Sequence, residues 1–365
     1  MPSVPISKTK IVIPHRRPEL LSRTRLLEGL SALLDRKLIL LSAPAGYGKT
    51  SLLIDLAHSV SQPVCWLSLD SLDRDPQRFM VYLIAALGEQ FPEVARPVLT
   101  QLNELKSLEE DAEALLVALT NELYEQVEQD FLLVIDDVHL VEDVPAIMNL
   151  LNRFIQLVDE NCHLILASRT LPNLPDFTLM VARDQVDGLS YSDLAFLPQE
   201  VQALFAQNFH QHLSEEQARQ LVEQTGGWIT GMILSSIPAA GQVAGVNTFS
   251  YLGRQVLDQQ PAELRLFLLR TSLPMEFNAS LCEIMLSPFY SEPPNWAQLI
   301  HQVVEKNLFA LPVGTHERWL RYHPLFRDFL QARLREERPQ EVRPILERLT
   351  YAYEQLGEWE KAYFT

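Results

Sequence analysis

Residues 38–51 of this chain read Leu38-Ile39-Leu40-Leu41-Ser42-Ala43-Pro44-Ala45-Gly46-Tyr47-Gly48-Lys49-Thr50-Ser51. The apolar residues 38–41 predict a buried strand, because strands of a parallel sheet are covered on both faces. Pro44, Gly46 and Gly48 then predict a tight turn. A helix is expected to begin directly after that turn. This order of strand, turn and helix indicates an α/β fold.

The turn also predicts a phosphate-binding loop. Its glycines allow successive backbone amides to face an anion at the start of the helix. In the pattern G-x-x-x-x-G-K-[ST] the lysine reaches the β- and γ-phosphates and the hydroxyl holds Mg²⁺, which are the places of Lys49 and Thr50. Ala43 stands at the first glycine, where it costs little if no positive φ is needed. The expected nucleotide contacts are Ala45, Gly46, Tyr47, Gly48, Lys49, Thr50 and Ser51.

A second apolar strand, residues 131–135, leads directly into Asp136 and Asp137. Ligands of open parallel sheets lie outside the carboxyl ends of the strands, so both motifs deliver their polar residues to one edge. Asp136 is expected to hold the Mg²⁺ shell, and Asp137 to orient or deprotonate an attacking water. The spacing from the first motif suits intervening βαβ units. Together the two motifs predict a purine nucleotide bound with Mg²⁺.

Two further strands complete the predicted sheet. Residues 163–167 lead into Ser168 and Arg169, whose cation is expected to face the γ-phosphate. Residues 64–69 form the other strand and lead into an acidic loop at 73–75, followed by a helix with an apolar face. Apolar runs that alternate with helical patterns predict a doubly wound parallel sheet in the first half of the chain.

The composition limits the classes of protein to which this chain can belong. The chain has 365 residues, of which 47% are hydrophobic and 21% charged, which is typical of a globular protein with two or three domains. No apolar run approaches a bilayer span and no signal peptide opens the chain. Cys65, Cys162 and Cys282 lie in apolar contexts without metal-ligand spacing, so a cytoplasmic location is expected. The net charge of −17 argues against direct nucleic-acid binding by this segment.

The second half changes to helical patterns. Helices are expected near residues 196–209 and from 213, the latter capped by Ser214. The Gly226-Gly227 pair ends that helix, and a linker is expected at 238–245. Short helices within 251–306 precede a predicted hairpin, with strands at 309–313 and 319–322 and a turn at Gly314-Thr315. Helices followed by a two-stranded wing indicate a winged helix.

Several motifs in this order resemble the signalling NTPases called STAND proteins, in the branch of the MalT-type bacterial transcription activators. They are residues 43–50, Trp66-Leu67-Ser68-Leu69-Asp70, the run Leu133-Val134-Ile135-Asp136-Asp137-Val138-His139-Leu140, Ser168-Arg169 and Tyr322-His323-Pro324-Leu325-Phe326. The resemblance covers residues 14–330. It implies a P-loop NTPase domain with a parallel sheet, then a helical domain and a winged helix, closing around ADP. ATP exchange, favoured by an inducer, produces a homo-oligomer in that family.

The resemblance also implies roles for single residues. Lys49, Asp137 and Arg169 become the catalytic set, with Asp137 acting on water and Arg169 sensing the phosphate; Thr50 and Asp136 become the metal ligands. His323 takes the place of a histidine that reaches the β-phosphate of ADP, although the residues alone favour a structural turn histidine. Arg23 matches a position beside the adenine and ribose. Ile229 stands where related proteins place a proline near the base, which puts that contact in doubt.

The expected domains are 1–188 for the nucleotide-binding domain, 189–247 for the helical domain, 248–335 for the winged helix and 336–365 for the start of a helical-repeat arm. Neighbouring repeats and a basic DNA-binding helix-turn-helix, which the family uses for sensing and output, are not found in this segment. An inducer or partner protein is therefore expected to act through repeats outside it.

Other classes of protein remain open from the sequence. A nucleotide-binding scaffold of a defence or signalling sensor would share every motif. An AAA-type motor typically carries glutamate after the metal aspartate, where this chain has Asp137, and a nucleoside kinase needs a second substrate pocket and an arginine lid. Slow ATP hydrolysis that serves a switch is the favoured interpretation.

Overall fold

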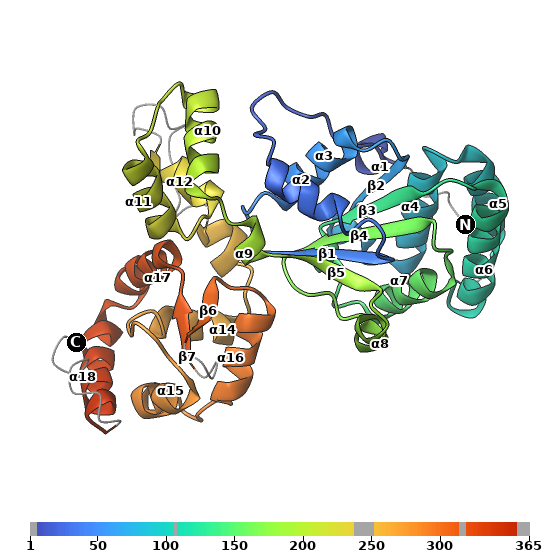
Figure 1. Cartoon of the computed structure of the whole chain (residues 1–365). Coiled ribbons are helices and arrows are strands. Elements are labelled where there is room, and N and C mark those ends of the chain that lie inside the picture. The colour runs from blue at the N-terminus through green and yellow to red at the C-terminus, as the bar shows by residue number, and fades with distance from the viewer. Residues whose placement is uncertain (1–5, 106–107, 237–251, 314–318, 356–365) are drawn as a thin grey trace. The chain divides into compact units, whose positions relative to one another are not determined.

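The computed structural model describes residues 6–105, 108–236, 252–313 and 319–355 (Figure 1). The chain divides into two compact units. The first comprises residues 1–43, 48–194 and 207–210, and the second comprises residues 44–47, 195–206 and 211–365. The predicted phosphate-binding loop therefore contributes to both units, because its tip, Pro44–Tyr47, clusters with the second. The predicted domain boundaries stay predictions.

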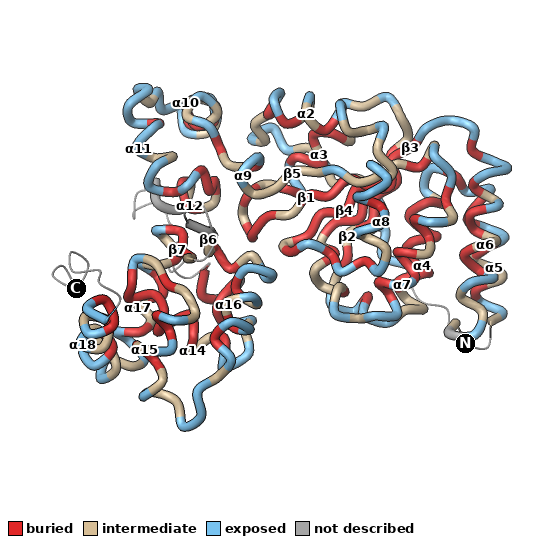
Figure 2. The backbone as a smooth tube through the Cα atoms, turned by 60° about the horizontal axis from the view of Figure 1, so that its bottom comes forward, coloured by how far each residue is buried: buried red, intermediate tan, exposed pale blue. Residues whose placement is uncertain are grey.

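The first unit is built on a parallel sheet with strand order β2-β3-β4-β1-β5. Four of its strands were predicted, and their bounds are Leu38–Ser42 for β1, Val64–Ser68 for β2, Phe131–Asp136 for β3 and Cys162–Ser168 for β4. Most of their residues are buried, as Figure 2 shows in red. β1 and β3 both neighbour β4, so the ends that carry the two predicted motifs and Arg169 lie on adjacent strands.

A fifth strand, β5 (Val186–Ser190), pairs with β1 and was not predicted. It lacks the run of β-branched residues that marks a strand in a sequence. Gly188 lies opposite Leu40, and a Cβ at this glycine would stand 2.0 Å from the Leu40 carbonyl oxygen. The pairing of β5 therefore depends on the close approach of its backbone to that of β1, which a glycine permits, and not on an apolar pattern in its sequence.

Helices pack around this sheet. The bounds are α1 (Lys8–Ile11), α2 (Thr24–Ser31), α3 (Lys49–Ser59), η1 (Ser71–Arg74), α4 (Pro76–Gly88), α5 (Pro92–Glu104), α6 (Leu108–Gln126), η2 (Val138–Leu140), α7 (Pro145–Leu157), α8 (Phe177–Ala182) and α9 (Tyr191–Leu194). The parallel strands β2 and β3 are connected by the 3-10 helix η1 and the α-helices α4, α5 and α6. All residues from Phe79 to Leu87 in α4 are buried, so this helix forms much of the core.

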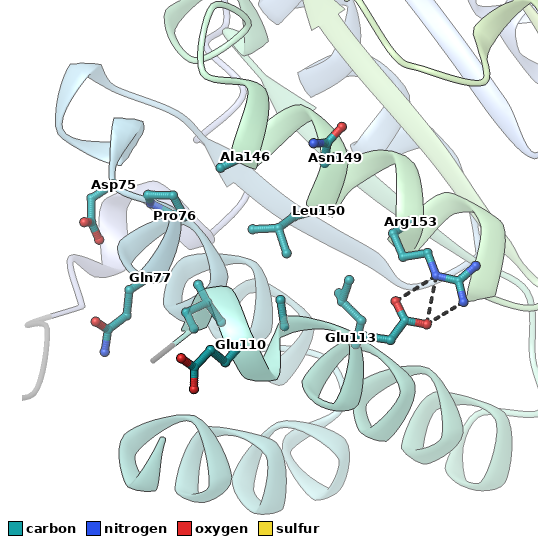
Figure 3. Close-up of a pocket in the computed structure, with 12 residues that line it drawn as sticks. Asp75, Pro76, Gln77, Glu110, Glu113, Ala146, Asn149, Leu150 and Arg153 are labelled. Atoms are coloured by element: carbon teal, nitrogen blue, oxygen red, sulfur yellow. Dashed lines mark hydrogen bonds and ion pairs between the residues drawn. The ribbon is translucent and has the colours of Figure 1, made fainter. Parts of the chain in front are cut away.

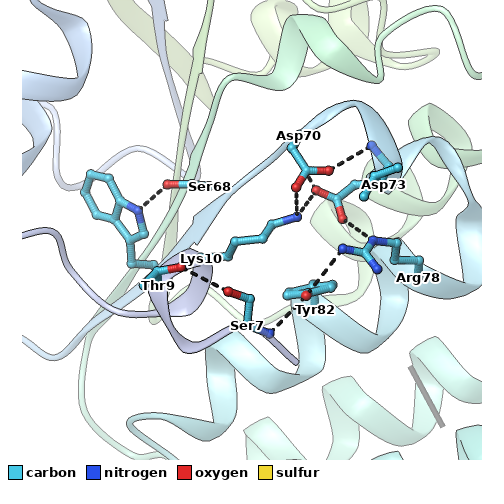
Figure 4. A network of polar contacts seen from close by, with 10 residues as sticks. Ser7, Thr9, Lys10, Ser68, Asp70, Asp73, Arg78 and Tyr82 are labelled. Atoms are coloured by element: carbon cyan, nitrogen blue, oxygen red, sulfur yellow. Dashed lines mark hydrogen bonds and ion pairs between the residues drawn. The ribbon is translucent and has the colours of Figure 1, made fainter. Parts of the chain in front are cut away.

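The predicted acidic loop at 73–75 is instead the end of η1 and the N-cap of α4 (Figure 4). Asp73 is fully buried, and it pairs with Lys10 of α1 and with Arg78 of α4. Lys10 also lies 3.1 Å from Asp70, and Tyr82 accepts hydrogen bonds from Arg78 and from the Ser7 amide. This network holds α1 against the end of β2.

The second unit is mainly helical, as predicted. Its bounds are α10 (Pro198–Phe209), α11 (Glu215–Thr225), α12 (Ile229–Ser236), η3 (Gly253–Leu257, a π-helix), α14 (Ala262–Arg270), α15 (Ala279–Leu286), η4 (Ser287–Phe289), α16 (Trp296–Glu305), β6 (Ala310–Val313), β7 (Trp319–Tyr322), α17 (Pro324–Glu337) and α18 (Pro339–Gln355). The last residues of α10, from 207, cluster with the first unit.

The local signals in this half are confirmed. Ser214 and Gln217 form a capping box at the start of α11, and Gly226 ends that helix with a φ of 54°. β6 and β7 pair antiparallel, which gives the predicted wing its two strands. The predicted turn at 314–315, the linker at 238–245 and the residues of the repeat arm after 355 lie outside the described residues.

Two expectations from composition can be compared with the structure. All three cysteines are buried thiols without a disulfide. Within the described ranges, no helix combines the length and the apolar character that a bilayer crossing requires.

Candidate functional site

The phosphate-binding loop connects β1 to α3 with the geometry that its glycines predict. Gly46 and Gly48 have φ values of 83° and 84°, in the left-handed region, and α3 begins at Lys49 directly after them. Ala43 is absent from the positive-φ residues of the described chain, which explains why alanine can replace glycine there. A Cβ on Gly48 would meet no atom within 4 Å, so there is open space beside the start of the helix. Backbone amides at a helix start next to such space suit a phosphate.

Lys49 folds back across this loop. Its side chain is buried, and Nζ donates a hydrogen bond of 2.6 Å to the carbonyl oxygen of Ala43. The pKa of the amine is lowered to about 8: burial lowers it most, the nearby Asp136 opposes that shift, and the charge of Arg169 adds to it. The lysine therefore stays largely protonated at neutral pH, and a phosphate group bound at this loop would meet its positive charge.

Thr50 and Asp136 bring the two predicted motifs into direct contact. The Thr50 hydroxyl donates to a carboxylate oxygen of Asp136 at 2.6 Å, and the backbone amide of Asp137 donates to the other oxygen at 2.9 Å. Burial, reinforced by the charge of Asp137, raises the pKa of Asp136 to about 6. A hydroxyl and a buried carboxylate are hard oxygen donors, and a buried carboxylate with a raised pKa gains from a neighbouring cation. The residues present therefore fit Mg²⁺.

Asp137 adopts an unusual backbone conformation, with a φ of 61°. Left-handed geometry is uncommon outside glycine, and aspartate is one of the residues that tolerates it. Here it turns the chain out of β3 into η2. Burial raises the pKa of Asp137, whereas Lys49 and Arg169 lower it, so its carboxylate shares the field of both cations.

Arg169 follows β4, which lies between the strands that carry the other motifs. Its charge lowers the pKa values of Lys49, Asp137 and His139, which places the guanidinium in the same cluster of charges. The next residue, Thr170, donates its hydroxyl to Glu142, so the segment after β4 is bonded to the segment after η2.

His139 belongs to this cluster and was not predicted as a site residue. Its Nδ1 lies 3.9 Å from a carboxylate oxygen of Asp137. Burial, and then the charges of Arg169 and Lys49, lower its pKa to about 3, so the imidazole is neutral. The signal available in the sequence was a histidine two positions after Asp137, which places it in the turn that follows β3.

Arg23 and His323, whose roles came from the family resemblance, lie in different compact units. Arg23 is buried and donates to the carbonyl oxygen of Leu194 at 2.8 Å. His323 is also buried, and its Nε2 pairs with the carbonyl oxygen of Thr225, whereas Nδ1 has no hydrogen-bond partner in the described part of the chain. Because a carbonyl only accepts, Nε2 carries the proton. Nucleotide contacts by these two residues stay predictions.

A separate hollow in the first unit has a volume of about 600 Å³ and lies among α4, α6 and α7 (Figure 3). Arg153 of α7 and Glu113 of α6 form an ion pair beside it. None of the residues that line it belongs to the phosphate-binding loop or to the Asp136–Asp137 pair. The candidate nucleotide site is therefore distinct from this hollow.

Comparisons with known proteins match two segments of this chain to known domains. Residues 33–170 match the AAA domain, and residues 253–342 match the MalT winged helix domain. The HTH-type transcriptional regulator MalT of Yersinia pestis (strain Pestoides F) is 32% identical over 347 residues, and that of Klebsiella pneumoniae (strain 342) is 30% identical over 344. Each alignment covers 90% of this chain but 37% of the relative, so the chain spans about 37% of these relatives' length.

Among solved structures, the Walker-type ATPase PABY2304 of Pyrococcus abyssi is similar, with a TM-score of 0.52 and 16% identity, over 87% of this chain and 95% of that one. At that identity the likeness shows the fold alone. The predicted resemblance to the MalT branch is confirmed by the winged-helix match and by the relatives. The chain thus joins a P-loop domain that matches the AAA domain to a winged helix that matches the MalT winged helix domain.

Proposed function

We propose that this chain is the nucleotide-dependent core of a MalT-like transcription regulator, a switch that binds ATP or ADP with Mg²⁺. It rests closed with ADP and forms a homo-oligomer after exchange for ATP. The observation that carries the nucleotide part is the hydrogen bond between Thr50 and Asp136 beside the buried amine of Lys49. Residues from two distant motifs meet there in the constellation that P-loop ATPases use.

In this proposal the loop from Ala45 to Ser51 holds the phosphates, and Thr50 and Asp136 hold Mg²⁺. The bound ion would neutralise phosphate charge. Asp137 orients or deprotonates the attacking water, and Lys49 and Arg169 stabilise negative charge on the phosphates. Neutral His139 lies beside Asp137, with its Nδ1 3.9 Å from the carboxylate. Hydrolysis is slow, because its role is to reset the switch.

The regulatory part of the proposal rests on the relatives. Both MalT proteins are named as HTH-type transcriptional regulators, and the match to them runs through the winged helix. We propose that His323 binds the β-phosphate of ADP. Because its neutral ring has a single N–H, at Nε2, that group would then donate to the phosphate in place of the Thr225 carbonyl. We also propose that Arg23 lies beside the base. An inducer or partner protein would act through repeats outside this segment, in the cytoplasm.

We further propose that this segment does not itself bind DNA. Its net charge is −17, and a surface with that balance repels a phosphate backbone. DNA binding by a MalT-like regulator would then reside in another part of the full protein.

The nucleotide recovered from the purified protein tests the proposal. The protein is denatured, and the released small molecules are separated and quantified. A closed resting switch predicts ADP in a ratio near one per chain. Recovery of a nucleotide other than ADP, or failure of the protein to bind added ADP, would overturn it.

A further inference from the structure

We propose that Trp228 and Thr230 are positioning residues for the bound phosphates, because their hydrogen bonds orient the peptide groups at the tip of the phosphate-binding loop. The inference rests on the proposed nucleotide binding and assigns residues that neither the motif nor the family resemblance singled out. All of the contacts involved lie within the second compact unit, which includes Pro44–Tyr47.

Two consecutive carbonyl groups of the loop accept hydrogen bonds from Trp228, the residue before α12, and from Thr230 in the first turn of α12. The indole Nε1–H of Trp228 donates to the carbonyl oxygen of Ala45 at 2.9 Å. The hydroxyl of Thr230 donates to the carbonyl oxygen of Gly46 at 3.1 Å, and the Thr230 amide approaches the same oxygen at 3.4 Å. Outside donors therefore fix the direction of both carbonyls.

Fixing a carbonyl also fixes the amide of the next residue. In a planar trans peptide, the C=O and N–H bonds point in opposite directions. When the Ala45 and Gly46 carbonyls point toward α12, the N–H groups of Gly46 and Tyr47 point the other way. Successive amides directed to one side of a loop form an anion-binding nest. The two side chains thus hold part of that nest in the orientation that a phosphate needs.

The donors are themselves held in place. Trp228 is fully buried, and its indole packs edge-to-face against Phe309 and His323, with ring centroids 5.2 Å and 5.9 Å away. A Cβ on Gly46 would stand 2.5 Å from the Thr230 hydroxyl and 2.7 Å from the Trp228 nitrogen. Gly46 therefore serves a second purpose besides its positive φ: it lets both donors approach the backbone.

This arrangement couples phosphate binding to the packing of Trp228. If the indole bond strengthens nucleotide binding by some factor, then bound nucleotide strengthens the indole bond by the same factor. Because Phe309 and His323 surround the indole, the packing of the winged helix responds to the presence of a phosphate.

The test measures the dissociation constants of Mg-ADP and AMP by calorimetry for Trp228→Phe and Thr230→Val. Each variant removes one donor and keeps most of the side-chain shape. A net hydrogen bond corresponds to an affinity change of about twofold to tenfold. We expect that loss for ADP, with a much smaller change for AMP, which lacks the β-phosphate. Thr230→Ser keeps the hydroxyl and should restore ADP affinity.

Matched controls separate positioning from general destabilisation. Trp66→Phe removes the buried indole bond to Ser68, and Thr120→Val removes a buried hydroxyl bond to Leu116. Both should lower the melting temperature without changing the ratio of ADP to AMP affinity. The inference is overturned if Trp228→Phe and Thr230→Val bind ADP as the wild type does, or lose ADP and AMP affinity equally. A wild-type protein that binds no ADP would instead overturn the proposed function.

Discussion

The hydroxyl of Thr50 lies 2.6 Å from a carboxylate oxygen of Asp136, although the two residues are 86 positions apart in the chain. Thr50 is in the first turn of α3 and Asp136 is the last residue of β3. Their contact joins the phosphate-binding loop to the acidic pair, and it explains why a substitution on either side should affect Mg²⁺ and nucleotide together.

The two aspartates of this pair should separate in function. Asp136→Ala removes the proposed metal ligand and should chiefly weaken Mg²⁺-dependent nucleotide binding. Asp137→Ala should retain ATP but lower its hydrolysis by about 10² to 10⁴-fold, the usual contribution of a positioned base. Single-turnover assays with saturating ATP measure both. Unchanged hydrolysis in Asp137→Ala would remove its catalytic role.

His139 should matter for hydrolysis and not for ADP binding. Its Nδ1 lies 3.9 Å from Asp137, and misplacement of a reacting group by about 1 Å can cost about a hundredfold in rate. We expect His139→Ala to slow single-turnover hydrolysis by up to that factor, with His139→Asn less affected. Since the pKa of His139 is about 3, His139 does not titrate between pH 5.5 and 8, and the pH dependence of the hydrolysis rate in this range should keep the same ionisations in both variants. If both variants lose an ionisation that the wild type shows, His139 is not neutral in the folded protein.

His323 and Arg169 should have opposite effects on nucleotide preference. A hydrogen bond from His323 to a charged phosphate is worth roughly 1.5–3 kcal/mol, so its loss shifts the closed state by about tenfold to a hundredfold. His323→Ala should release ADP faster while still binding ATP. Arg169→Ala should reduce the preference for ATP without loosening ADP. Stopped-flow release of a fluorescent ADP analogue compares them, and equal ADP off-rates in His323→Ala and wild type would leave His323 a structural residue.

The same histidine predicts a pH dependence of stability. Burial lowers the pKa of His323 below its ordinary value. As pH falls through about 6.5, the unfolded chain gains a proton that the folded chain refuses, so the free energy of unfolding decreases. His323→Gln should reduce the loss of melting temperature between pH 7.5 and 5.5. His301→Gln, on the exposed side of α16, is the control. Identical pH profiles for His323→Gln and wild type would contradict this assignment.

The sequence predicted four of the five strands because their apolar runs are dense and end in motif residues. It could not predict β5, whose pairing depends on the contact between Gly188 and the Leu40 carbonyl. It also placed Asp73 in an acidic loop, whereas Lys10, from a distant segment, allows this carboxylate to be buried.

In the candidate site, too, some residues could be predicted from the sequence and others could not. Gly48, Lys49, Thr50 and Asp136 were predictable, because local motifs carry their chemistry. His139 required knowledge of the electrostatic field that it shares with Arg169. Trp228 could not be foreseen as a partner of the phosphate-binding loop, since its hydrogen bond to Ala45 spans 183 positions of the chain.

Calorimetric titration of Mg-ADP into the wild type and Lys49→Ala tests the central claim most directly. Lys37→Ala is the matched control. Lys37 directly precedes β1, at the end away from the phosphate-binding loop, and its half-buried amine donates to the carbonyl oxygen of Val158. We predict that the wild type and Lys37→Ala bind ADP with one site per chain and that Lys49→Ala shows no measurable binding. ADP affinity in Lys49→Ala equal to that of the wild type would contradict the assignment of this loop as the phosphate site.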